Sequence, residues 1–186
     1  MTKQKIDFVI TWVNGADSRW KQEKNNCMKQ FCLISETDDR TERYRDWGIL
    51  PYWFRGVEMF APWVRKIHFV TWGHLPEWLN VDHPKLHIVK HTDYISEKYL
   101  PTFNPKDFLP TFNSHTIEWN FHRIQGLSDN FVYFNDDMLL LNTVKPTDFF
   151  IDSKPVDMLA LQPDVANADD TVMPYIYLNN AMVLAK

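Results

Sequence analysis

The chain has 186 residues, of which 45% are hydrophobic and 24% are charged, and its formal net charge at pH 7 is −4. This composition is ordinary for a single soluble globular domain with a substantial core. The negative charge argues against a nucleic-acid-binding protein that relies on a basic patch. No apolar run reaches transmembrane length, so any membrane contact should be peripheral.

The first predicted element is a buried strand over residues 6–13, in the segment "IDFVITWV". Asn14 and Gly15 then predict a sharp turn, and Asp17 or Ser18 can cap a helix after it. A strand–turn–helix unit can direct backbone N–H groups at a phosphate. A plain Asn-Gly turn is nevertheless the commoner meaning of this spacing.

The two cysteines mildly favour a cytoplasmic protein, and no signal peptide is recognised at the beginning of the chain. Its apolar run is short and is interrupted by Asp7, so it does not read as a signal peptide. The two cysteines, Cys27 and Cys32, have no zinc-site spacing and are too few for a disulfide framework. We expect both to be reduced thiols on a helix.

A second helix is predicted over residues 50–61, where Leu50, Phe54, Val57 and Ala61 form one apolar stripe that ends at a proline. Arg55 lies away from this stripe.

Arg45 and Asp46 precede the same helix. Arginines beside an acidic metal site would suit a diphosphate, although exposed salt bridges are the commoner explanation of such neighbours.

Further buried strands are predicted over residues 67–72, 86–89, 131–134 and 158–161, and a helix over about 115–125. Asn113 or Ser114 can cap that helix and Gly126 can end it. The segment "YIYLNNAMVLAK" near residue 186 reads as the opening of another helix. Strands that alternate with helices predict an α/β domain with a mostly parallel sheet, which binds ligands beyond the carboxyl ends of its strands.

The predicted helix over 115–125 would place His115, Glu118 and His122 on one face. The opposite face would be apolar, with Ile117, Phe121 and Ile124. Imidazole and carboxylate groups together can transfer a proton or bind an anion, and Arg123 could reach a phosphate at the rim. A solvated helix face is an equally good interpretation.

The stretch "FVYFNDDMLLL" places polar residues inside an apolar run. We expect residues 131–134 to be a central strand that is buried on both faces, with Asn135, Asp136 and Asp137 at its carboxyl end. Two adjacent carboxylates are tolerated there if a divalent cation neutralises them, and a tight turn could bring both onto one metal. The alternative is an ordinary turn whose acids cap the next segment.

Taken together, the segments "IDFVITWVNGAD", "RDWGILPYWFRGVEMFAPWVRKIHFVTWGHLPEWLNVDHPKLHIVKH" and "LPTFNSHTIEWNFHRIQGLSDNFVYFNDDM" closely resemble the Stealth family. That family contains bacterial capsular and cell-wall polysaccharide phosphotransferases and the animal N-acetylglucosamine-1-phosphotransferase. The resemblance covers two family blocks, at about 6–17 and 45–150. It implies that residues 1–186 are the N-terminal part of a single catalytic domain with a nucleotide-sugar-binding, GT-A or Rossmann-like fold. The family's third and fourth blocks have no counterpart in this sequence.

The resemblance also implies a reaction. A UDP-hexose or UDP-N-acetylhexosamine would donate its sugar-1-phosphate to a hydroxyl of an acceptor glycan, with Mg²⁺ or Mn²⁺ as cofactor and UMP as the product released. The acceptor would be lipid-linked, at the inner face of a bacterial membrane. A glycosyltransferase with the same donor, or a module that only binds nucleotide sugar, are the alternatives.

The shared motifs also assign site residues by position. The implied catalytic residues are His115, Glu118, His122 and Arg123. The implied donor-binding residues are Trp12, Asn14, Gly15, Asp17, Arg45, Asp46, Arg55, Asn113 and Asn135, and the implied metal ligands are Asp136 and Asp137. One departure is Pro51, which stands where the family usually has Arg or Lys.

Overall fold

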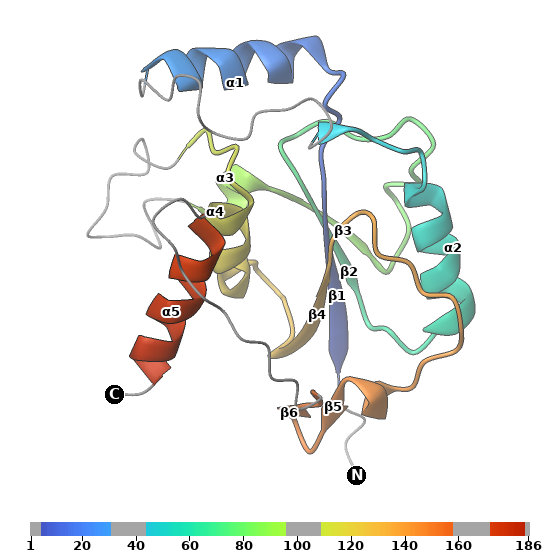
Figure 1. Ribbon diagram of the computed structural model, residues 1–186. Coiled ribbons are helices and arrows are strands. Elements are labelled where there is room, and N and C mark those ends of the chain that lie inside the picture. Colours follow the sequence, from blue (N-terminus) through green and yellow to red (C-terminus); the bar gives the residue numbers. More distant parts are fainter. Residues whose placement is uncertain (1–4, 31–43, 96–108, 158–171, 185–186) are drawn as a thin grey trace. The chain divides into compact units, whose positions relative to one another are not determined.

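Four short strands of mainly apolar residues make one parallel sheet in a computed structural model of the chain (Figure 1). The structure describes residues 5–30, 44–95, 109–157 and 172–184. The strands of this sheet are β1 (Ile6–Trp12), β2 (Ile67–Thr71), β3 (Leu86–Lys90) and β4 (Asn130–Phe134), in the spatial order β3-β2-β1-β4. The predicted α/β class and parallel sheet are confirmed.

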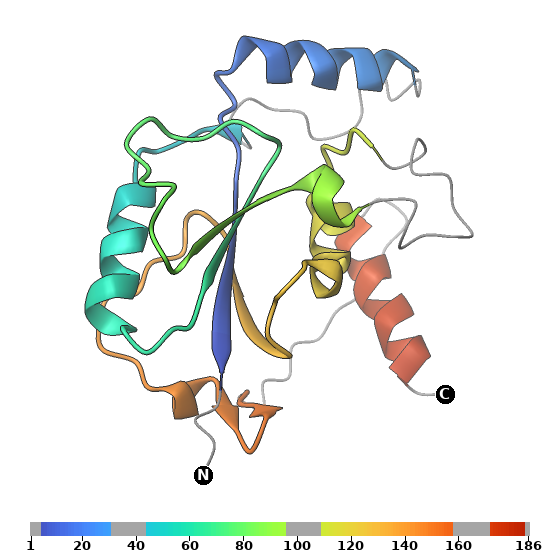
Figure 2. The ribbon, with the colours of Figure 1, turned by 180° about the vertical axis from the view of Figure 1, so that it is seen from behind.

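Helices lie on both faces of this sheet (Figures 1 and 2). They are α2 (Leu50–Phe60) on one face, and α3 (His91–Tyr94), α4 (Ser114–Trp119) and the 3₁₀ turn η4 (Phe121–Arg123) on the other. The described residues before 157 also form α1 (Ser18–Gln30), the 3₁₀ turn η5 (Pro146–Asp148) and a short antiparallel pair, β5 (Phe150–Ile151) and β6 (Lys154–Pro155).

The alternating side chains of β1 divide the core into two layers. Phe8 and Ile10 pack with Trp53 of α2 in one cluster. Val9 packs with Tyr94 and other residues of the second face. Because helices cover both faces, the side chains on both sides of β1 and β2 are buried, and the apolar residues do not simply alternate with polar ones.

Contacts divide the chain into two units, residues 1–156 and 157–186. The second unit contains α5 (Val172–Leu184), which confirms the helix predicted for "YIYLNNAMVLAK". The helix predicted over 50–61 is also confirmed, with a difference of one residue at its end. The strand predicted over 158–161 and the predicted thiol of Cys32 lie outside the described residues. Cys27, a half-buried residue of α1, is a free thiol on a helix, as predicted.

The strand predicted over residues 131–134 is present as β4, but its predicted place in the centre of the sheet is wrong. In the sheet of the described residues, β4 pairs with β1 alone and forms an edge, and four of its five residues are only half-buried. The apolar run after it does not continue the core, because Met138 is 51% exposed and Leu141 is 83% exposed. The segment 131–141, which is mostly apolar in sequence, therefore contains a strand, a turn and a surface segment.

The helix predicted over 115–125 is shorter than expected. It ends at Trp119, and Asn120 has φ −101° and ψ 0°, outside the helical geometry. The side-chain amide of Asn120 donates to the carbonyl of Thr116 at 2.8 Å, and its backbone N–H lies 3.4 Å from the carbonyl oxygen of Ile117. Asparagine competes in this way with the backbone, and the chain continues as the 3₁₀ turn η4.

A fully buried carboxylate connects the amino ends of the strands. Asp7 accepts hydrogen bonds from Arg65 through Nη2 and, at 2.8 Å, through Nε, and from the backbone N–H of Ser128 at 2.9 Å. His68 Nε2 lies 3.0 Å from the same carboxylate. Burial alone would raise the pKa of Asp7, but the hydrogen bonds from His68, Arg65 and Ser128 outweigh it and lower this pKa.

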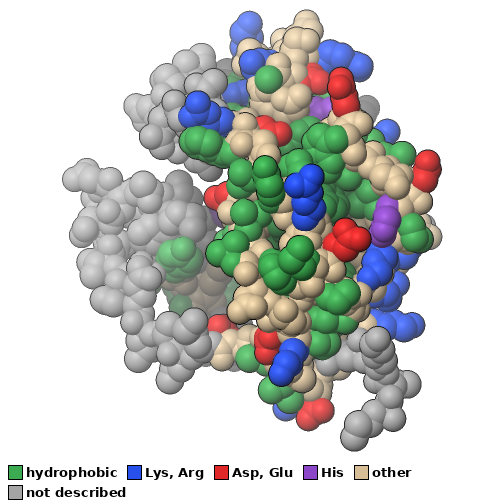
Figure 3. Space-filling view, turned by 90° about the vertical axis from the view of Figure 1, so that its right-hand side faces the viewer, with side chains coloured by type: hydrophobic (Ala, Val, Ile, Leu, Met, Phe, Trp, Pro, Cys, Tyr) green, Lys and Arg blue, Asp and Glu red, His purple; other side chains and the backbone are tan. Residues whose placement is uncertain are grey.

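The outer surface of the α2 side carries hydrophobic side chains interspersed with charged ones (Figure 3). Tyr52 and Met59 of α2 are among the exposed large hydrophobic residues. Within the described residues, no helix has both the length and the apolar character needed to cross a membrane.

Candidate active site at the carboxyl edge of the sheet

The strand order creates a switch point between β1 and β4. From β1 the chain proceeds to β2 on one side, whereas β4 pairs on the other side, and open α/β sheets bind ligands at such points. Phe134, the last residue of β4, pairs with Ile10. The turn after β4, which contains Asp136 and Asp137 and is called the acidic turn below, therefore begins level with the last residues of β1, just before the Asn14–Gly15 turn.

The turn after β1 is held by its own side chains and by a neighbouring loop. Asn14 Oδ1 accepts from Ala16 N at 3.0 Å, and Asp17 Oδ1 accepts from the backbone N–H groups of Arg19 at 2.8 Å and Trp20 at 2.9 Å. Asp17 therefore caps α1, as predicted. The hydrogen bond from Trp20 N–H lowers the pKa of Asp17; burial opposes this effect, and the hydrogen bond from Arg19 N–H adds to it.

Gly15 is required by a close approach of the 44–48 loop to this turn. A Cβ at position 15 would lie 2.0 Å from the carbonyl oxygen of Tyr44. In the same loop, Asp46 Oδ2 accepts from Trp12 Nε1 at 3.1 Å and Oδ1 accepts from Gly48 N at 2.7 Å. The loop thereby brings a carboxylate to the end of β1.

The two predicted basic contacts lie at the surface. The Arg45 guanidinium stacks 4.5 Å from the ring centroid of Trp47, and that of Arg55 lies 5.5 Å from the ring of Tyr52 on the exposed face of α2. Arg45 adjoins Asp46 in the loop, whereas Arg55 is in the middle of its helix.

Residues 135–138 form the tight turn that was predicted after β4, because Met138 N donates to the carbonyl of Asn135 at 3.1 Å. Asp136 is half-buried and Asp137 is exposed. Burial raises the pKa of Asp136, and the negative charges of Asp137 and Asp46 raise it further. Three carboxylates thus interact at this edge.

This acidic turn fits a divalent cation that is shared with a ligand. Its charges repel one another, which a cation would relieve, and Mg²⁺ commonly uses one or two carboxylates together with substrate phosphates. Among the described residues, no three or more His, Cys, Asp or Glu side chains are grouped closely enough to hold a metal by themselves. The donor set therefore suits a metal–phosphate site rather than a closed protein cage.

Tyr133 connects the acidic turn to α4, and sequence reasoning missed it. Its hydroxyl lies 2.7 Å from Asn135 Oδ1, 3.3 Å from Glu118 Oε1 and 3.2 Å from Thr11 Oγ1. Burial raises the pKa of Tyr133 to about 12, so the phenol keeps its proton and acts as a donor to either acceptor. Glu118 is consequently placed beside the end of β4.

Of the other residues predicted on this helix, Asn113 and His115 lie at its start, whereas His122 and Arg123 lie beyond its end. Asn113 caps α4 by accepting from His115 N at 2.9 Å, and His115 is exposed. The 3₁₀ turn after α4 carries His122, whose Nε2 accepts from Arg123 Nε at 3.2 Å. His122 and Arg123 lie toward the amino ends of the strands, because the chain after them reaches Asp7, at the start of β1, by Ser128. The prediction that His122 shares a helix face with His115 and Glu118 is therefore wrong, because α4 ends before His122.

A second missed residue is His74, which comes after β2 in "VTWGHLP". Its Nε2 accepts from the backbone N–H of Asn14 at 2.8 Å. The signal available in the sequence was a histidine shortly after the end of a buried strand, at the edge where ligands bind.

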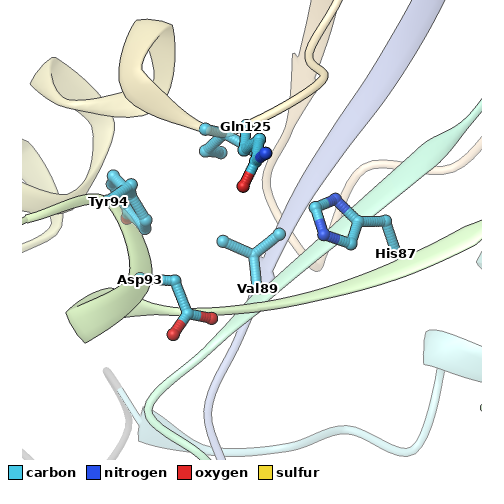
Figure 4. A pocket seen from close by; sticks show the side chains of 6 residues that line it. His87, Val89, Asp93, Tyr94 and Gln125 are labelled. Carbon is cyan, nitrogen blue, oxygen red and sulfur yellow. The ribbon is translucent and has the colours of Figure 1, made fainter.

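A separate pocket of about 360 Å³ lies beside β3 (Figure 4). It is lined by His87, Val89, Asp93, Tyr94, Ile124 and Gln125. His87 Nδ1 lies 2.9 Å from His68 Nδ1, which links the pocket to the buried Asp7. None of the predicted site residues lines it.

Comparisons with known proteins match the segments that form the carboxyl edge of the sheet. The chain matches the family descriptions "Stealth protein CR1, conserved region 1" over residues 4–32 and "Stealth protein CR2, conserved region 2" over residues 43–108 and 105–158. These matches include the turn after β1, the 44–48 loop and the acidic turn.

Several streptococcal proteins are similar over most of the chain. Capsular polysaccharide phosphotransferase WcwK of Streptococcus pneumoniae is 44% identical over 183 residues, which are 98% of this chain and 51% of that protein. Capsular polysaccharide phosphotransferase CpsJ of Streptococcus thermophilus is 44% identical over 96% of this chain and 70% of its own length. Receptor polysaccharide phosphotransferase WefC of Streptococcus oralis is 46% identical over 86% of this chain and 46% of its own length. The chain thus spans about half the length of WcwK.

Proposed function

The chain belongs to the Stealth family, and on this premise we propose that it contributes to a sugar-1-phosphate transfer in polysaccharide synthesis. The donor is a UDP-hexose or UDP-N-acetylhexosamine, and the acceptor is a hydroxyl of a glycan. One observation carries the proposal: the half-buried Asp136 and its acidic neighbours lie at the switch point beside the Asn14–Gly15 turn. The relatives named as capsular or receptor polysaccharide phosphotransferases support the same reaction class.

Binding of the donor diphosphate uses the two turns. The absence of a side chain at residue 15 lets the 44–48 loop pack against the Asn14–Gly15 turn, and α1, whose N-terminus can face a phosphate, begins three residues later. Asp136 and Asp137 would hold Mg²⁺ or Mn²⁺ together with diphosphate oxygens. When bound, such an ion neutralises charge on the phosphoryl group and on the departing nucleotide.

Glu118 is the best placed general base. The acceptor hydroxyl gives its proton to this carboxylate, and its oxygen attacks the phosphorus next to the donor sugar. The bond from that phosphorus to the UMP oxygen breaks, so UMP leaves and a phosphodiester forms. Tyr133 and Asn135 orient Glu118 and the turn relative to each other. His115, at the start of the same helix, is the alternative base.

The product distinguishes this reaction from its alternatives. The protein is incubated with UDP-glucose or UDP-N-acetylglucosamine, Mg²⁺ and a glycan acceptor, and released nucleotides are separated by ion-exchange chromatography. UMP supports the proposal. UDP instead would indicate a glycosyltransferase, and donor binding without release would indicate a binding module.

Variants test the role assigned to the acidic turn. Asp137→Asn should lower UMP release by at least about 100-fold and remove its dependence on Mg²⁺, since a metal ligand is lost. Asp129→Asn, which changes a carboxylate just before β4 and outside the acidic turn, should retain wild-type release. Wild-type activity in both Asp136→Asn and Asp137→Asn would reduce these acids to ordinary turn residues.

The proposal includes a cellular location. A lipid-linked acceptor at the inner face of the bacterial membrane would suit a cytoplasmic protein with peripheral membrane contact. Exposed Tyr52 and Met59, with Arg55 beside them, support contact of α2 with a lipid surface. Flotation with vesicles that contain anionic lipid tests this contact, and recovery of all protein in the unbound fraction would contradict it.

A further inference from the structure

His74 ties the end of β2 to the turn after β1. Asn14 donates its backbone N–H to His74 Nε2 at 2.8 Å. The segment that presents this imidazole is itself fixed, because Thr71 Oγ1 donates to the carbonyl of His74 at 2.7 Å. The ring also packs edge-on against Trp12, with centroids 5.1 Å apart. The imidazole is therefore held in one orientation relative to β1.

This hydrogen bond decides the tautomer of the imidazole. Nε2 must offer its lone pair to the Asn14 N–H, so in the neutral ring the proton is on Nδ1. Nδ1 is buried and has no hydrogen-bond partner among the described residues. It lies 3.7 Å from Asp17 Oδ2, which is too far for a hydrogen bond but close enough for an electrostatic attraction.

The surroundings of His74 keep this ring uncharged at neutral pH. Two titratable groups face it, namely Asp17 at the start of α1 and His91 at the start of α3. Burial lowers the pKa of His74 despite the opposing charge of Asp17. Burial also lowers the pKa of His91 to about 4, so this second imidazole is neutral at pH 7 as well.

We infer that His74 is a positioning residue for the donor site, where its neutral imidazole braces the Asn14–Gly15 turn through Nε2 and faces Asp17 through Nδ1–H. A single ring thus contacts both ends of the turn and links it to β2. The inference rests on the proposed function, in which this turn binds the nucleotide-sugar diphosphate. His74 touches the turn rather than the reacting atoms.

A pair of near-isosteric variants tests this role. Glutamine can place an acceptor near the position of Nε2, whereas asparagine reaches only the position of Nδ1. His74→Asn and His74→Ala should raise the KM for UDP-sugar about tenfold, because the backbone N–H of the half-buried Asn14 loses its partner. His74→Gln should change it by less than about twofold. Equal KM values in wild type, His74→Asn and His74→Gln would overturn the inference.

The dependence on pH gives a readout that a purely structural role would not move. Protonation of Nε2 removes the acceptor, so the wild-type donor KM should be flat near pH 7 and rise as the pH falls through the His74 pKa, which is below 6.5. His74→Gln cannot titrate and should lack this rise. His83→Gln, a matched control in an exposed loop, should keep it. An identical rise in His74→Gln would assign it to another group and contradict the brace.

Nitrogen-15 NMR of the imidazoles tests the brace without any turnover. His74 should show a protonated Nδ1 and an unprotonated Nε2. His83 should show the reverse, because its Nδ1 accepts from Lys85 N at 3.2 Å. A proton on His74 Nε2 would overturn the inference. If the wild-type protein releases no UMP, the proposed function fails, and this spectrum still decides whether His74 holds the turn.

Discussion

Asp136 shows how a single residue can be unfavourable for the free protein and useful for binding. Its half-buried carboxylate lies near two other carboxylates, those of Asp137 and Asp46, and its burial and their charges raise its pKa. A group whose charged form is disfavoured costs stability at neutral pH. Such a cost is expected where a cation and an anionic ligand complete the site.

Asp136→Asn should therefore stabilise the protein in the absence of divalent ions. We expect the free energy of unfolding in urea at pH 7 to rise by on the order of 1 kcal/mol. Because the folded-state pKa is raised, the wild type should regain this difference as the pH falls through that pKa toward 3.8. Asp129→Asn is the matched control and should show almost no change. A less stable Asp136→Asn protein would mean that the carboxylate makes a favourable bond.

At the scale of elements, the site is made by the turns and loops that connect the strands and helices. The turn after β1, the 44–48 loop and the turn after β4 supply Asn14, Asp46 and Asp136, while β1 and β4 keep them in register. Gly15 allows the first two of these segments to touch. A side chain there would separate them.

Gly15→Ala should disrupt this contact. The added methyl group would lie 2.0 Å from the carbonyl oxygen of Tyr44, so one backbone must move. We expect a loss of about 1–3 kcal/mol in the free energy of unfolding and a weaker affinity for UDP-sugar by calorimetry. Ala16→Ser, at the exposed neighbouring position, should change the stability by less than about 0.5 kcal/mol. Unchanged stability and affinity in Gly15→Ala would show that the two segments can separate freely.

At the scale of the whole sheet, the amino ends and the carboxyl ends of the strands, its amino and carboxyl edges, differ in how their carboxylates are paired. At the amino edge, Asp7 is fully buried, and its pKa is lowered by the hydrogen bonds it accepts. At the carboxyl edge, burial and two neighbouring negative charges raise the pKa of Asp136. At the amino edge, the hydrogen-bonded and ion-paired carboxylate of Asp7 connects β1, β2 and the segment before β4. At the carboxyl edge, the negative charges of the acidic turn are available to a cation and its ligand.

Asp7→Asn should lower the stability of the whole unit of residues 1–156. Removing the fully buried carboxylate leaves the half-buried Arg65 without its ion-pair partner, and the cost should approach the roughly 3–5 kcal/mol of a fully buried pair without exceeding it. Urea unfolding at pH 7 measures the loss, with Asp82→Asn, an exposed carboxylate, as control. The lowered pKa of Asp7 means that the wild type loses this stabilisation as the pH falls through a value below 3.8, and the variant should not. A change under about 1 kcal/mol would show that the junction is not needed.

The sequence by itself determined the elements that depend on near neighbours. Apolar runs located the four strands of the sheet, an Asn-Gly pair located the turn after β1, and each helix cap was narrowed to two candidates that include Asp17 and Asn113. These features are predictable because a turn, a cap or a buried strand is decided by residues within a few positions along the chain. The family resemblance added the order of the motifs.

Only the tertiary structure decided which of these features meet. The pairing of β4 with β1 brings Asp136 beside the first turn, and it makes β4 an edge rather than a centre. Tyr133 and His74 act through contacts 15 and 60 residues away, with Glu118 and Asn14, and no local pattern encodes such pairs. The physical reason is that strand order is selected by burial on both sheet faces together, which depends on residues distant in the sequence.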